Sequence, residues 1–255
     1  MKKVIIFGDL PIATKVALFI KKLKNLSLEG VVIGNKNPNN NDPWENIPFL
    51  EGYSKNNGIK ILSMEELKEG YEKKELYLGL SCRFSKIIKK DIIDKFEFGI
   101  LNLHGGLLPE FAGVYSVNHT LLCNSKIGGG AIHFIDEGID TGDIIKRCEF
   151  AVEENDTAYT LFQKTQIALY EGIKEILIKI DNQEKISTIS KEKLIAKGYP
   201  FRYFDKKSLE GKKEINISEL NSEEAILKIK AFDFPGHEPA YIKINGKKIY
   251  LRTKI

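Results

Sequence analysis

Short apolar runs alternate with stretches of helical spacing along most of the chain. The runs cover residues 4–7, 31–33, 59–62, 76–80, 100–103 and 131–135. Apolar residues recur at helical intervals over 13–23 and 87–96. A third helix is expected after Ser63, because Glu66 three residues later completes a capping box. Strands that alternate with helices predict an α/β fold, with a mostly parallel sheet covered by helices on both faces.

A longer periodic stretch predicts an amphipathic helix that begins near residue 158. The positions on its inward face are Ala158, Leu161, Phe162, Thr165, Leu169, Ile173, Ile176, Leu177 and Ile180. Asp156 is placed to cap the start of this helix. A polar stretch follows at 181–185, so we expect a first, catalytic domain that comprises residues 1–190.

Residues 191–255 have a different pattern. Two short alternating runs, 241–244 and 248–251, flank Asn245-Gly246, a pair typical of tight hairpin turns. A helix is expected near 222–230, with Asn221 before it as the cap. These features predict a small C-terminal α+β domain that contains a β-hairpin.

The segment 34–60 is polar and interrupted by prolines, so a long loop is predicted there. Loops of this length are uncommon in compact domains unless they bind something. Trp44, the only tryptophan, lies in this segment. Two roles are open for it: stacking on a ring of a ligand, and anchoring the loop to the core.

The composition describes a soluble globular protein: 255 residues, 42% hydrophobic, 29% charged and a net charge of +4. Lysine-rich surfaces account for this mild charge, and we expect neither a nucleic-acid partner nor a membrane partner. The apolar run near the N-terminus ends at Gly8-Asp9, too early for a signal peptide, and a cytoplasmic location is expected. Gly8 stands alone where a dinucleotide fingerprint needs three glycines, so the sheet is expected to be Rossmann-like without a bound dinucleotide.

Three polar side chains form the strongest candidate site. Asn102 and His104 end an apolar strand and share one face of it, and Asp140 follows another strand within a turn. Ligands of open α/β sheets bind at this edge. Alone, a histidine at a strand end or an aspartate in a turn is ordinary. Together they supply an amide donor, a proton carrier that titrates near neutrality and a carboxylate to orient it. These groups can pass an acyl unit to an amine without a metal.

The surrounding motifs carry a family resemblance. Asn102-Leu-His104, Leu107-Leu108-Pro109, Gly113 and the stretch 139–145 resemble the formyltransferases that use 10-formyltetrahydrofolate, closest to the nucleotide-sugar N-formyltransferases. The resemblance implies that Asn102, His104 and Asp140 are the catalytic trio, with no metal. It also implies that 10-formyltetrahydrofolate, the co-substrate, contacts Lys86, Ile87, Ile88, Gly106, Leu107, Leu108, Pro109, Asp136 and Gly138.

The chain departs from this pattern at Ala112, where many relatives have arginine, and at the glycine run 128–130. Both departures bear on the acceptor more than on the reaction. The length, short tail and mild charge of the chain favour a nucleotide-linked amino sugar as acceptor. Such an acceptor implies a role in bacterial surface-glycan synthesis, such as that of lipopolysaccharide or O-antigen. A homodimer is possible by analogy with the family. A methionyl-tRNA formyltransferase and a non-catalytic folate-binding or nucleotide-sugar-binding relative stay open. The candidate acceptor contacts are Gly8, Asp9, Trp44 and Asn118.

Overall fold

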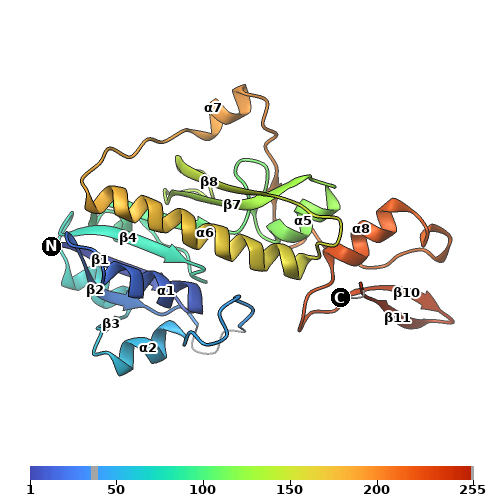
Figure 1. Cartoon of the computed structure of the whole chain (residues 1–255), viewed down its shortest axis with the longest axis horizontal. Helices are drawn as coiled ribbons and strands as arrows, with labels where there is room; N and C mark the ends of the chain where they lie inside the picture. Colours follow the sequence, from blue (N-terminus) through green and yellow to red (C-terminus); the bar gives the residue numbers. More distant parts are fainter. Residues whose placement is uncertain (36–39, 254–255) are drawn as a thin grey trace.

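A seven-stranded sheet forms the centre of the protein, whose computed structural model describes residues 1–35 and 40–253. The strands run in the order β3-β2-β1-β4-β5-β7-β8 (Figure 1). They are β1 (Lys2–Gly8), β2 (Leu26–Val32), β3 (Ile61–Leu62), β4 (Leu76–Cys82), β5 (Phe96–His104), β7 (Ile127–Phe134) and β8 (Ile144–Ala151). The first five are parallel, and β7 and β8 are antiparallel to their neighbours. The predicted Rossmann-like α/β class is confirmed.

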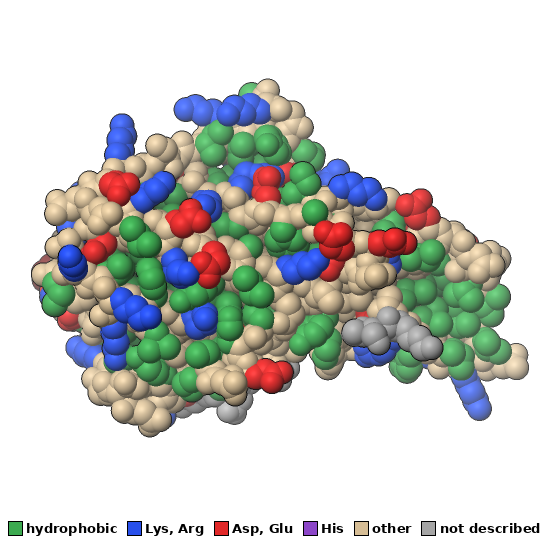
Figure 2. Space-filling model, in the orientation of Figure 1, with side chains coloured by type: hydrophobic (Ala, Val, Ile, Leu, Met, Phe, Trp, Pro, Cys, Tyr) green, Lys and Arg blue, Asp and Glu red, His purple; other side chains and the backbone are tan. Residues whose placement is uncertain are grey.

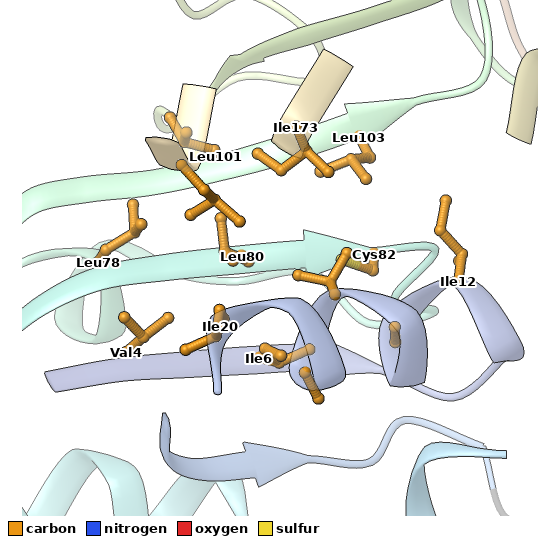
Figure 3. Packing of buried hydrophobic residues seen from close by; sticks show 14 of the residues in the cluster. Val4, Ile6, Ile12, Ile20, Leu78, Leu80, Cys82, Leu101, Leu103 and Ile173 are labelled. Carbon is orange, nitrogen blue, oxygen red and sulfur yellow. The ribbon is translucent and has the colours of Figure 1, made fainter. Parts of the chain in front are cut away.

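Helices cover both faces of the sheet. On one face α1 (Pro11–Ile20) and α6 (Ala158–Asp181) pack against the strands, and Figure 3 shows Ile20 and Ile173 facing Ile6, Leu80 and Leu101. The opposite face packs on α3 (Met64–Gly70) and α4 (Lys90–Ile93). Because both faces are buried, the strands read as continuous apolar runs without alternation.

The N-cap of helix α6 lies one residue later than expected, although the helix begins at Ala158 as predicted. Ser63 caps α3 through the predicted capping box with Glu66. For α6 the N-cap is Thr157, whose hydroxyl accepts from the Thr160 N–H. The prediction that Asp156 is the cap was wrong, because its carboxylate instead accepts from the Glu153 N–H and the Thr160 hydroxyl. Likewise α8 (Glu223–Ala231) is capped by Ser222, one residue after the predicted Asn221.

Removing the cap of α6 gives a first prediction. Thr157→Ala should lower the free energy of unfolding by about 1 kcal/mol, because it leaves an N–H of the first turn without its partner. Thr157→Ser is the matched control, since it keeps the hydroxyl. Urea unfolding followed by circular dichroism measures both variants. Equal stability of the alanine and serine variants would contradict this role.

Two local predictions were wrong in extent. The segment 34–60 contains α2 (Leu50–Asn56), whose Leu50 and Tyr53 join the core beside α1. The helix predicted over 87–96 is limited to α4, because β5 begins at Phe96. Ile87 lies before that helix and is 77% exposed, so it is no part of a buried helical face.

Most of the C-terminal part packs at one end of α6, whereas Leu194 of its first helix packs against Leu108, Ala131 and Ile144 (Figure 1). It comprises α7 (Lys191–Ala196), β9 (Tyr203–Phe204), η1 (Ile217–Glu219), α8, β10 (Ala240–Ile244) and β11 (Lys247–Leu251). The predicted hairpin is present, with Asn245 and Gly246 at φ 48° and 74° in its turn. Figure 2 shows hydrophobic side chains gathered over this hairpin end. The boundary near residue 190 stays a prediction. Within the described ranges, no helix combines the length and apolarity that a membrane crossing needs.

Short strand β9 brings the start of the C-terminal part back to the loop after β5, in a separate two-stranded sheet. It pairs with β6 (Ala112–Gly113), which follows the loop after β5. Behind this pair, the ring of His119 in α5 (Ser116–Leu122) stacks on Phe204 with ring centroids 3.6 Å apart. The start of the C-terminal part therefore lies directly over the segment that leads out of β5.

Candidate active site

The three residues of the predicted trio meet at the carboxyl end of β5. Asn102 and His104 project from one face of the strand, and Asp140 reaches them from the turn between β7 and β8, where its φ is 54°. His104 Nδ1 lies 3.5 Å from Asp140 Oδ2. The same oxygen accepts a hydrogen bond of 2.8 Å from the Gly113 N–H. Residues 36 positions apart are thus joined by an imidazole–carboxylate pair.

His133 adds a fourth group to the trio. Antiparallel pairing of β5 with β7 sets it opposite Asn102. Its Nε2 lies 3.1 Å from Asn102 Nδ2 and 3.5 Å from Asp140 Oδ1. Its Nδ1 is 2.8 Å from the Phe134 carbonyl, which can only accept a hydrogen bond. In the neutral ring, therefore, Nδ1 donates and Nε2 can accept from the Asn102 amide.

Burial and charge act in opposite directions on the titrating groups. Burial lowers the pKa of His104, although the Asp140 carboxylate and the Phe111 carbonyl, 2.8 Å from Nε2, both favour its charged form. Burial opposes ionisation of Asp140 as well. The close approach of His133 Nε2 and of His104, and the hydrogen bond from the Gly113 N–H, outweigh it and lower the Asp140 pKa to about 2. Near pH 7 the pair is a neutral imidazole beside a carboxylate.

A cavity of about 750 Å³ opens beside His104 and Gly105. The start of α5, residues 115–118, lines one side. Side chains from 206–213 and 232–241 in the C-terminal part line the other. Its charged lining residues are Arg83, Lys206, Lys213, Glu210 and Glu238. The volume is that of a site for a small organic ligand.

A sequence model described as "Formyl transferase" matches residues 4–177, most of the chain. The chain belongs to the formyl transferase family. Among its relatives is the methionyl-tRNA formyltransferase of Clostridium tetani, 35% identical over 141 residues, which are 53% of this chain and 44% of that protein. The GDP-perosamine N-formyltransferase of Brucella melitensis is 30% identical, over 66% of this chain and 58% of its own. This formyl transferase spans about half the length of the curated relatives it matches.

A solved structure extends the likeness to the C-terminal part. The N-formyltransferase of Helicobacter canadensis, in complex with folinic acid and dTDP-3-aminofucose, superimposes with a TM-score of 0.74 at 27% identity. The match covers 98% of this formyl transferase and 86% of that chain. The likeness therefore continues beyond residue 177, where the family match ends.

The predicted folate contacts of this formyl transferase surround the loop after β5 but do not reach the cavity. Leu107 and Leu108 are buried, and the Leu108–Pro109 peptide bond is cis. The others are Gly106, the segment 86–88, Asp136 and Gly138. None of them is among the described residues that line the 750 Å³ cavity. If they bind the folate, the cavity is free for the second substrate, and their role stays a prediction.

Of the four predicted acceptor contacts, Asn118 alone lines the cavity, and its side chain donates to the Ala231 carbonyl of α8 over 2.6 Å. The contacts that the structure describes for the other three residues support the fold. A Cβ on Gly8 would lie 2.7 Å from the Cys82 carbonyl, so this glycine permits close packing of β1 on β4. Trp44 packs edge-on against a tyrosine of α6.

The Asp9 side chain holds the chain that leaves β2. Its Oδ1 accepts from the N–H groups of Gly34 and Asn35, at 2.6 and 2.9 Å. The carboxylate is buried by these contacts. This position explains an aspartate at the end of β1 without a ligand.

Sequence reasoning missed several cavity residues. Arg83 and Gln166 line the wall nearest β4 and α6, and His237 lines the C-terminal side. Neither Arg83 nor Gln166 stands in a motif. The one signal for Arg83 is its position directly after an apolar strand, at the edge where such sheets bind ligands.

Within the described residues, no group of three or more histidine, cysteine, aspartate or glutamate side chains has the geometry of a metal site. Both carboxylate oxygens of Asp140 have partners: Oδ2 contacts His104 and the Gly113 N–H, and Oδ1 contacts His133.

Proposed function

We propose that the protein transfers a formyl group from 10-formyltetrahydrofolate to the amine of a nucleotide-linked amino sugar. The proposal rests on one observation: His104, paired with Asp140, lines a 750 Å³ cavity walled by both parts of the chain. A relative named for GDP-perosamine and a neighbour bound to dTDP-3-aminofucose support a sugar amine as acceptor.

The residues suit direct transfer. The neutral acceptor amine attacks the formyl carbon, a C–N bond forms, and the carbonyl oxygen becomes an oxyanion. Asn102 donates an N–H to that oxygen, and the loss of one such donor costs roughly 10²–10³-fold in rate. His104 takes the proton from the attacking nitrogen and gives it to the folate nitrogen as the bond to that nitrogen breaks. The Asp140 carboxylate and the Phe111 carbonyl stabilise the imidazolium between these two steps.

Transfer to methionyl-tRNA is the second candidate, favoured by the 35% identity to a methionyl-tRNA formyltransferase. A steady-state assay with 10-formyltetrahydrofolate separates the two. The acceptors are a panel of dTDP-, UDP- and GDP-linked amino sugars and charged initiator tRNA. We expect formylation of at least one amino sugar. Formylation of the tRNA alone would overturn the proposal, and no transfer at all would favour a non-catalytic binding protein.

The proposal also covers the cellular location, the oligomeric state and the biological role of the protein. It includes a cytoplasmic location, a homodimer and a role in surface-glycan synthesis. The hydrophobic side chains over the hairpin end are compatible with assembly. Light scattering on the purified protein tests the dimer.

A pH profile provides a second prediction. Burial lowers the His104 pKa from its usual 6.5, and the transfer needs the neutral ring, so His104 should add an acid limb to kcat/KM below that pH, besides the limb from the acceptor amine. Asp140→Asn removes a charge that raises the His104 pKa, so the acid limb should move to still lower pH while kcat decreases. Profiles over about pH 5–8 check this. The acceptor amine also titrates, but the substitution leaves the free substrate unchanged. An acid limb that stays in place would rule out His104 as its source.

A further inference from the structure

Arg83 occupies an unusual backbone position at the end of β4. Its φ is 55°, in the left-handed region where residues other than glycine, asparagine and aspartate are uncommon. Such conformations gather at binding sites, where the surrounding structure holds them in place. The side chain of Arg83 lines the cavity beside His104 and is about one third exposed, at 32%.

Two fixed groups orient this guanidinium. Its Nη1 lies 3.0 Å from Asp42 Oδ1, and Asp42 is wholly enclosed, with an exposed side-chain fraction of 0%. The other oxygen of that carboxylate accepts from the Ile12 N–H at the start of α1. The guanidinium carbon also lies 4.6 Å from the ring centroid of Phe162 on α6. A guanidinium has five N–H donors in one plane, so donors remain for a ligand in the cavity.

The wall beside Arg83 carries a second sign of a polar ligand. Gln166 on α6 lines the same cavity and is 1% exposed. Its Oε1 is enclosed and has no hydrogen-bond partner within the described residues. A buried amide oxygen without a partner is costly, and rotation of the amide exchanges its donor and acceptor ends. A ligand that carries hydroxyl or amine donors would satisfy this group.

The cavity lining has a small positive excess, three cations against the carboxylates of Glu210 and Glu238, which suits an anionic ligand. Besides Arg83, Lys206 and Lys213 line the cavity, and Lys213 is 3.3 Å from Glu238, which also contacts Lys248. Ala112 is buried and paired with β9, so it offers no cation to the cavity, and Arg83 supplies one from the end of β4. Planar guanidinium groups bind phosphate oxygens in pairs.

We propose that Arg83 binds the diphosphate of the nucleotide-linked acceptor, and that Asp42 and Phe162 hold the guanidinium in place for it. This inference rests on the proposed function, because it assigns the cavity to the acceptor. It makes Arg83 a residue that determines acceptor affinity.

Isothermal titration calorimetry tests this with dTDP, UDP and GDP and with the matching free nucleosides. The wild-type protein should bind at least one diphosphate more tightly than its nucleoside. Arg83→Gln should lower the affinity for that diphosphate by roughly 10–100-fold, which is what the loss of hydrogen bonds to a charged group costs. The affinity for the nucleoside should stay unchanged. Arg83→Lys should retain part of the diphosphate affinity, because it keeps the charge and loses the planar fork.

Controls separate this role from a folding defect. Arg202→Gln removes the same charge from an exposed side chain in a smaller, separate cavity and should leave diphosphate affinity unchanged. Arg83→Gln leaves Asp42 buried without its cation, so the double variant Asp42→Asn/Arg83→Gln is included, and it should show the same selective loss.

Three outcomes would overturn the inference. They are wild-type diphosphate affinity in the Arg83→Gln and double variants, no diphosphate binding by the wild type, and selective loss of 5-formyltetrahydrofolate binding. The last would assign Arg83 to the folate. Each can occur while the wild type still formylates an amino sugar, so failure of this inference is distinguishable from failure of the proposed function.

Discussion

Replacing His104 with alanine should reduce kcat for formyl transfer on the order of 10³-fold, within the range that general acid–base groups contribute. The affinity for 5-formyltetrahydrofolate should stay unchanged, because the imidazole acts only during proton transfer from the acceptor amine to the folate nitrogen. The buried ring is held in position by the Phe111 carbonyl and Asp140. Single-turnover rates and calorimetric folate binding measure the two effects separately.

Three further variants make this result specific. Asn102→Ala should lower kcat by roughly 10²–10³-fold through loss of the oxyanion donor. The double variant should lose less than the product of the single losses, because both residues act on one transition state. His119→Ala is the matched control: its ring stacks on Phe204 and lies outside the cavity lining, so it should lower the melting temperature and preserve kcat. Near-normal turnover in the Asn102 or His104 variant would refute the assigned roles.

Replacing Gly130 with alanine should destabilise the protein by about 1–3 kcal/mol, the usual cost of adding atoms to a packed core. A Cβ there would lie 2.7 Å from both the His104 carbonyl and Leu169 Cγ on α6. The glycine run at 128–130, which departs from the pattern of relatives, therefore lets α6 approach β7. Chemical denaturation measures the loss.

Gly52→Ala is the control for this substitution. Gly52 lies within α2, and a Cβ there would meet no atom within 4 Å. Alanine should stabilise that helix by about 0.5–1 kcal/mol. If both variants shifted stability in the same direction, steric crowding at Gly130 would not be the cause of the loss.

Much of the fold could be predicted because the signals are local, whereas the grouping of Asp140 with Asn102 and His104 comes from the family resemblance. The strand that ends in Asn102 and His104 is a continuous apolar run, the capping box at Ser63 needs four residues, and the hairpin follows from Asn245-Gly246. The seven-stranded sheet then brings its carboxyl ends together for topological reasons.

The missed parts depend on contacts between distant residues. His133 meets Asn102 only because β7 runs antiparallel to β5, a direction that an expected parallel sheet does not suggest. Arg83 meets Asp42 across 41 positions, and Asp42 lies in a segment without regular spacing. α2 is short, and its core contacts with α1 decide its conformation more than its own composition does.

The cavity has two walls of different origin. The wall that holds His104 lies inside the family match at 4–177, and the facing wall comes from residues beyond it. The bond-making groups and Arg83 therefore lie on one stretch of chain, and the charged groups of the facing wall lie on another. A lineage can exchange or rebuild the second stretch and acquire a new acceptor while its reaction chemistry is handed down intact.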